Sequence, residues 1–119
     1  MDRKALGKWG EERAAQYLRL HGYRILEKNY GCRMGEIDLI AVKKGIIAFV
    51  EVKLRKDASH GEAKEFVTYS KMRRIKSAAM LYLSRHETEL QPRFDVIEIY
   101  APDGEAGRIT INHIEDAFE

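Results

Sequence analysis

The feature of this sequence that most constrains its fold is a predicted β-hairpin in the first half of the chain. Two runs of strand-forming residues, Glu36–Lys43 and Ile46–Leu54, are separated only by the dipeptide Lys44–Gly45, as in a hairpin with a tight turn. Such a turn pairs Lys43 with Ile46, and that pair sets the register of all the others. A slip by one residue would mix apolar and charged side chains on both faces, so the hydrophobic pattern itself favours this register.

In this register the hairpin has one apolar face and one mixed face. The apolar face is predicted to carry Ile37, Leu39, Ala41, Ile46, Ala48, Val50, Val52 and Leu54. The other face carries Ile40, Val42, Ile47 and Phe49 near the turn, and Glu36, Asp38, Glu51 and Lys53 at the far end. Asp38 is therefore predicted to lie directly opposite Glu51, and Glu36 directly opposite Lys53.

Two opposed carboxylates require a compensating charge. Cross-strand Cβ atoms are about 4.5–5.5 Å apart, and like charges at that separation destabilise a sheet. Mg²⁺ would offset the repulsion, because it binds one or two carboxylates and leaves positions for water and phosphate. Lys53 lies on the same face as Glu51, roughly 6.6 Å along the strand, where it could orient a water molecule or stabilise charge on a phosphate. The alternative is a Glu36–Lys53 ion pair, with Asp38 and Glu51 solvated at a strand end.

Length and composition indicate one soluble domain. The chain has 119 residues, of which 45% are hydrophobic and 34% charged, enough for a single core with a highly charged surface. It has neither an apolar run of the ~20 residues that span a membrane nor a signal-peptide pattern. Its only cysteine is Cys32, which excludes an internal disulfide and makes a reducing cytoplasm the simplest location. The net charge of +2 does not by itself indicate a nucleic-acid partner.

The remaining patterns predict two helices and three more strands. The helices are expected over Asp2–His21, with Asp2 as N-cap and Gly22 just past the end, and over Thr68–His86, capped by Thr68 or Ser70. The further strands are expected over Tyr23–Asn29, Phe94–Tyr100 and Arg108–Ile114, with a loop at Tyr30–Gly35, a mobile loop at Arg55–Glu65 and one helical turn in Glu115–Glu119. A helix between the third and fourth strands allows a parallel crossover and a mixed sheet with helices on its faces.

Two charged features of the predicted helices each have two explanations. Glu11 shares the apolar stripe of the first helix, so it lies either at an exposed end of that stripe or toward a site. The first turns of the second helix carry Lys71, Arg73, Arg74 and Lys76. Cations there oppose the helix dipole, which indicates either an anionic partner or a solvated basic face.

This order of elements, with Asp38 on the second strand and Glu51-Val52-Lys53 on the third, resembles the PD-(D/E)xK nuclease superfamily. More narrowly, the chain resembles the YraN-like family of small bacterial proteins, relatives of archaeal Holliday-junction resolvases. The matching segments are GKWGEERAAQYL (Gly7–Leu18), GYRILEKNY (Gly22–Tyr30), GEIDLIAV (Gly35–Val42), FVEVKLR (Phe49–Arg55), the helix carrying Lys71, and RFDVIEI (Arg93–Ile99). The resemblance implies an α/β fold with a restriction-endonuclease-like αβββαβ core, in a single nuclease-like domain over residues 1–119.

The resemblance also implies roles for individual residues. Asp38 and Glu51 would bind Mg²⁺ or Mn²⁺, with the Val52 carbonyl as a further ligand. Lys53 would be the catalytic lysine, and Glu11 matches the first-helix glutamate of resolvase-like members. Contacts with the nucleic-acid backbone are expected from Arg55, Lys56, Lys71 and Arg74. In this chain Ile37, rather than proline, precedes Asp38.

Two functions of different classes follow. The first is a Mg²⁺-dependent endonuclease that hydrolyses phosphodiester bonds in DNA, including branched or structured DNA. The second is a non-catalytic nucleic-acid-binding or accessory module that keeps the fold. The intact set of Glu11, Asp38, Glu51 and Lys53 favours the nuclease, because a pure binder gains nothing from acids near phosphate. The expected partner is nucleic acid, DNA in preference to RNA, with no membrane; a homodimer is left open.

Overall fold

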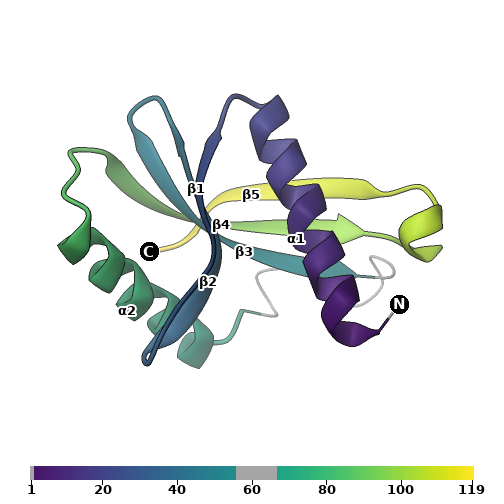
Figure 1. Ribbon diagram of the computed structural model, residues 1–119, viewed down its shortest axis with the longest axis horizontal. Helices are drawn as coiled ribbons and strands as arrows, with labels where there is room; N and C mark the ends of the chain where they lie inside the picture. The colour runs from purple at the N-terminus through teal and green to yellow at the C-terminus, as the bar shows by residue number, and fades with distance from the viewer. Residues whose placement is uncertain (1, 56–66) are drawn as a thin grey trace.

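The computed structural model describes residues 2–55 and 67–119. Over these residues the elements are α1 (Arg3–Leu20), β1 (Arg24–Cys32), β2 (Gly35–Lys43), β3 (Ile46–Arg55), α2 (Tyr69–Arg85), β4 (Gln91–Tyr100), a short 3-10 turn η3 (Gly104–Ala106) and β5 (Thr110–Phe118) (Figure 1). The predicted α/β class is confirmed, as is the αβββαβ order with a trailing strand. Neither α1 nor α2 is long and apolar enough to cross a membrane.

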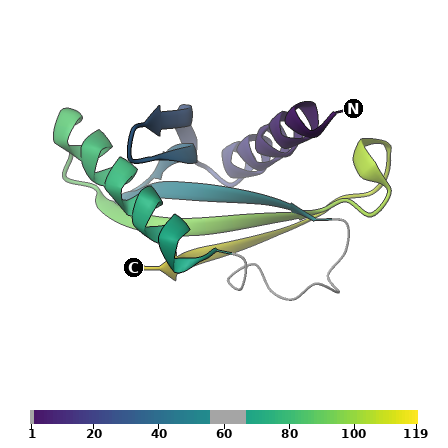
Figure 2. The ribbon, with the colours of Figure 1, turned by 90° about the horizontal axis from the view of Figure 1, so that it is seen from below.

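The strands form one mixed sheet in the order β1-β2-β3-β4-β5. β3 and β4 are parallel and are joined through α2, whereas the other neighbouring strands are antiparallel. Figure 2 shows β3, β4 and β5 side by side, with the two helices packed on the sheet. The predicted crossover is therefore present, and it brings the first turns of α2 back to the strands that carry the charged residues.

One core forms where α1 packs on the sheet. Ala14, Ala15 and Leu18 are fully buried and cluster with alternate residues of the hairpin, among them Leu39, Ala41, Ala48 and Val50. The side chain of Asp2 accepts a hydrogen bond from Ala5 N at the start of the helix, and Gly22 adopts φ 89° just past its end. Both predicted ends of this helix are confirmed within a residue or two.

A second core forms where α2 packs on the sheet. Ile75 and Ala79 cluster with Ile40, Ile47 and Phe49, which are the residues predicted for the mixed face of the hairpin. One assignment was wrong, because Ile37 belongs to this cluster and not to the α1 side. Ile37 lies beyond Leu39, the last β2 residue that pairs with β3, and it pairs with Tyr30 of β1, which packs against the same cluster.

Two predicted boundaries were also wrong. The expected loop at Tyr30–Gly35 is strand up to Cys32, followed by a tight turn into β2. The tail expected to be helical ends β5 instead, because Phe118 stacks on Phe94 with ring centroids 5.1 Å apart. Most of the expected loop Arg55–Glu65, with Lys56 in it, lies outside the described residues.

β4 carries two buried carboxylates, each with several donors. Asp95 is fully buried and accepts from Arg93 and from His113, in each case at 2.8 Å. Glu98 is 1% exposed and accepts from Arg55 at 3.1 Å, and from the Tyr100 hydroxyl and Asn112 at 2.8 Å. Because buried charges are tolerated only when paired, we interpret both residues as structural: their hydrogen bonds stabilise the β4–β5 half of the sheet.

Candidate active site

The ladder between β2 and β3 ends just before the charged residues. From the Lys43–Ile46 pair to the Leu39–Val50 pair the register is the predicted one. Beyond it the predicted direct pairing of Asp38 with Glu51 does not continue as a ladder. Instead, the Val52 N–H of β3 donates to Asp38 Oδ2 at 2.8 Å. The Asp38 carboxylate thus takes the place of the β2 carbonyl that would accept this hydrogen bond in a continued ladder. The acids therefore lie at a fork where β2 separates from β3.

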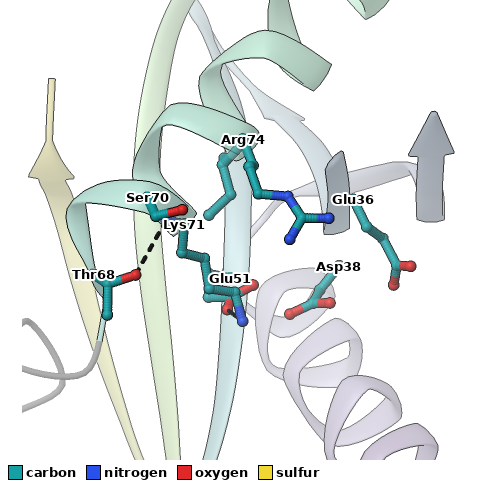
Figure 3. A pocket seen from close by; sticks show the side chains of 8 residues that line it. Glu36, Asp38, Glu51, Thr68, Ser70, Lys71 and Arg74 are labelled. Carbon is teal, nitrogen blue, oxygen red and sulfur yellow. Dashed lines mark hydrogen bonds and ion pairs between the residues drawn. The ribbon is translucent and has the colours of Figure 1, made fainter. Parts of the chain in front are cut away.

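A cavity of about 490 Å³ opens at this fork. It is lined by Glu36 and Asp38 from β2, Glu51 from β3, and Thr68, Ser70, Lys71, Arg74 and Ile75 from the start of α2 (Figure 3). Figure 3 also shows the Arg74 side chain extending toward the side of the cavity where Glu36 and Asp38 lie. Acids of the sheet thus face bases of the helix across one opening.

Glu51 is the most tightly held acid of the site. Its side chain is 3% exposed, and its Oε2 forms an ion pair with Lys71 Nζ and lies 3.5 Å from Lys53 Nζ. Burial lowers the pKa of Lys53 below its ordinary value, and the nearby Glu51 charge only partly offsets this. Burial also opposes the charge of Lys71, but the hydrogen bond to Glu51 and its charge leave the pKa of Lys71 raised. Lys53 therefore pairs with Glu51, not with Glu36.

Asp38 holds a proton more tightly than an ordinary aspartate does. Burial, followed by the charge of Glu51 and a hydrogen bond to it, raises the pKa of Asp38 to about 8, although the Val52 N–H opposes the shift. Asp38 and Glu51 are therefore a hydrogen-bonded pair of acids in which Asp38 favours its protonated form. A divalent cation would replace that proton, since it compensates both charges at once.

Glu11 approaches the same acids from α1. Its side chain hydrogen-bonds to Asn29, and burial together with the charges of Glu36 and Glu51 raises its pKa. Of the two explanations for Glu11, the structure supports proximity to the site. Asn29 was not identified as a site residue from the sequence. The only signal available there was an asparagine at the end of a predicted strand.

The remaining predicted site residues lie in three different settings. Arg74 lines the cavity, whereas Arg55 is 11% exposed and is bonded to the buried Glu98. Lys71 is inside the site on Glu51, a contact that sequence reasoning did not anticipate. Lys56 lies outside the described residues. All of these roles stay predictions, and of the three described bases Lys71 and Arg74 line the cavity.

A second, smaller hollow of about 320 Å³ adjoins the first. It is lined by Met34, Ser70, Arg73, Arg74 and Ser77, so Ser70 and Arg74 belong to both. The β1–β2 turn is pressed against α2 here, because a Cβ on Gly35 would lie 2.5 Å from the Arg74 carbonyl oxygen. Lys71, Arg73 and Arg74 of α2 therefore line the two adjoining hollows beside the carboxylates.

The donor set suits a hard divalent cation with few protein ligands. Within residues 2–55 and 67–119, no group of three or more histidine, cysteine, aspartate or glutamate side chains is arranged to hold a metal. Mg²⁺ does not need such a group, since one or two carboxylates with water and phosphate oxygens suffice. Asp38 and Glu51, with the adjacent Val52 carbonyl, fit that requirement.

Comparison with known proteins covers nearly all of the chain. Residues 10–99 match the family model described as Uncharacterised protein family UPF0102. A UPF0102 protein of Caldanaerobacter subterraneus subsp. tengcongensis is 44% identical over 99% of this chain and 98% of its own length. One from Syntrophomonas wolfei is 48% identical over 97% and 98%, and one from Myxococcus xanthus is 37% identical over 99% and 92%.

Proposed function

Since this chain belongs to the UPF0102 family, as its resemblance to YraN-like proteins predicted, we propose a function from its own site: a metal-dependent nuclease that hydrolyses phosphodiester bonds in DNA. The observation that carries the proposal is that Asp38 and Glu51 lie together in one cavity lined by Lys71 and Arg74. A structural ion pair would not need a second buried acid, Asp38, hydrogen-bonded to Glu51 and with its pKa raised by burial and by the Glu51 charge.

Each residue of the site has a task in this reaction. Asp38, Glu51 and the Val52 carbonyl would hold Mg²⁺ or Mn²⁺, which when bound supplies a Lewis acid that polarises a phosphate oxygen. Lys53, beside Glu51, donates to a phosphate oxygen or orients the attacking water, and its lowered pKa suits proton transfer. Glu11 adds a third carboxyl group near Glu36 and Glu51 and would position water on the α1 side of the site.

The border of α2 would hold the nucleic acid. Arg74 faces the cavity and Arg73 the adjoining hollow, so successive phosphates can meet successive guanidinium groups along the helix. Guanidinium groups pair well with phosphate oxygens, and such contacts dominate affinity for a nucleic-acid backbone. DNA, and branched DNA first, is the substrate to test, because the resemblance is to Holliday-junction resolvases.

One observation supports the non-catalytic alternative. The Lys71 ammonium pairs with Glu51 across the cavity, as it would in a binding module that retains the fold. The two functions differ in what they do to substrate, because only the nuclease converts it to shorter products.

The test is a cleavage assay on labelled single-stranded, duplex, flap and four-way-junction DNA, with Mg²⁺, with Mn²⁺ or with chelator. We expect metal-dependent cleavage of at least one substrate, and loss of cleavage in Asp38→Asn and Glu51→Gln. An exposed acid of the β4–β5 turn, changed in Asp103→Asn, serves as the matched control and should cleave normally. Binding without cleavage of any substrate, with either metal, would favour the accessory module.

A further inference from the structure

We propose that Lys71 is an internal counter-ion, which neutralises Glu51 in the metal-free protein and is displaced when a divalent cation binds. The inference rests on the proposed function, because it concerns the same carboxylates. It assigns Lys71 a role different from the backbone contact predicted for it from the sequence.

The first observation is that Glu51 cannot be compensated by water. Its side chain is 3% exposed, so an ionised carboxylate there needs a cation at contact distance. Two ammonium groups supply that charge, Lys53 at 3.5 Å and Lys71 in direct contact with the same oxygen, Oε2.

The second observation distinguishes the two lysines. Lys53 extends from the same strand as Glu51 and its side chain is 22% exposed, whereas the Lys71 side chain comes from α2 and is 44% exposed. The backbone of Lys71 is held at the start of the helix, where its N–H donates to the Thr68 hydroxyl at 3.1 Å. Only the flexible stem of Lys71 has to move for its ammonium to leave Glu51.

A bound divalent cation and the present position of Lys71 are incompatible. Lys71 Nζ contacts Glu51 Oε2, so a cation bound to the same carboxylate would lie within a few ångströms of this ammonium group, and a charge of +2 at that separation repels it strongly. Once displaced, the ammonium would stay at the mouth of the cavity beside Arg74, where the phosphate of a substrate brings negative charge. The same side chain would thus pair with Glu51 when no cation is bound and with the substrate phosphate when one is.

This explanation also accounts for a base in an unfavourable place. A cation in the first turn of a helix opposes the helix dipole, and α2 has no acid in its first turn to balance Lys71. The ion pair with Glu51, across the cavity, supplies the missing anion.

The test compares Mn²⁺ binding by isothermal titration calorimetry in wild type, Lys71→Met and Lys76→Met. Methionine keeps the apolar stem and removes the charge, and Lys76 lies on the same helix but lines neither hollow. Removing the competitor should tighten Mn²⁺ binding by Lys71→Met roughly three- to tenfold, about 0.7–1.4 kcal/mol, while Lys76→Met stays within about twofold of wild type. Equal or weaker binding by Lys71→Met would overturn the proposal while leaving the metal site intact. No Mn²⁺ binding by any of the three proteins would overturn the metal site and the counter-ion together.

A second measurement uses only wild-type protein, so it does not depend on a variant that folds. Amine labelling by reductive methylation, read residue by residue by mass spectrometry, should modify Lys71 slowly in chelator and several-fold faster with saturating Mg²⁺. Labelling of Lys76 should not change. A Lys71 labelling rate that is the same in chelator and in saturating Mg²⁺ would contradict displacement.

Discussion

The raised pKa of Asp38 makes a quantitative prediction about stability without any metal. In the unfolded chain its carboxyl titrates near 3.8, and in the folded protein near 8. Between these values the folded state holds a proton that the unfolded state has lost, so stability falls as pH rises, by about 1.36 kcal/mol per pH unit. The stability that Asp38 contributes is fully present below its pKa in the unfolded chain, and it is lost as the pH rises to its pKa in the folded protein.

The substitution that isolates this effect is Asp38→Asn. The amide oxygen can still accept from the Val52 N–H, and the amide group can donate to Glu51 as the protonated acid does. At pH 7 the loss of stability caused by the raised pKa of Asp38 is at most about 4 kcal/mol, from roughly three pH units at 1.36 kcal/mol each. Relaxation of the cavity reduces this loss, and so do the positive charges of the nearby lysines. We therefore expect Asp38→Asn to stabilise the metal-free protein by about 2 kcal/mol.

The assay is urea unfolding in chelator at pH 5, 7 and 8, for wild type, Asp38→Asn and the control Asp103→Asn. All other titrating groups are shared, so the difference between wild type and variant reports Asp38 together with its contact to Glu51. The gain from Asp38→Asn should grow with pH across this range, and that from Asp103→Asn should be within about 0.5 kcal/mol of zero. A destabilised Asp38→Asn, or a gain that does not vary with pH, would refute a carboxyl that resists ionisation.

Three further predictions concern metal, catalysis and binding. Millimolar Mg²⁺ or Mn²⁺ should stabilise wild type by mass action, by about 2.7 kcal/mol at 100 times Kd, and so raise its melting temperature, and Asp38→Asn should abolish the response; an unchanged melting temperature in Mn²⁺ would favour the non-catalytic alternative. Lys53→Ala should slow single-turnover cleavage by on the order of 10² or more with little change in binding, and a loss confined to affinity would make this lysine a backbone contact. Arg73→Ala with Arg74→Ala should weaken binding to duplex DNA and flatten its salt dependence by roughly 0.9 log units per lost phosphate contact, and a salt titration that keeps the wild-type slope would remove α2 from the interface.

The parts of the fold that could be predicted from the sequence are those set by local periodicity. The alternation of apolar residues across Lys44–Gly45 was sufficient for the register near the turn, because a slip would have buried charges. Asp2 and Thr68 cap their helices as predicted, since capping depends only on neighbouring residues. The approach of Asp38 to Glu51 followed from the same hairpin.

The errors arise where tertiary structure overrides the local pattern. Ile37 packs in the other core at the point where β2 no longer pairs with β3, and a sequence pattern does not show where a ladder ends. The partner of Lys71 could not be predicted, because the distance from α2 to Glu51 depends on how the β3–α2–β4 crossover docks. The tail looked helical from its acids, but the stacking of Phe118 on Phe94 extends it as a strand.

The division of the chain at α2 has a consequence for genetics. The residues that line the 490 Å³ cavity all precede position 76, whereas β4 contributes the buried Asp95 and Glu98 with their partners. Breaking such a pair costs about 3–5 kcal/mol, so substitutions at these two positions would reduce the amount of folded protein rather than its chemistry. In a selection for activity, alleles in β4 and β5 should be temperature-sensitive and rescued by stabilising second-site changes. Alleles at Asp38 or Glu51 should be null at every temperature and resist such rescue.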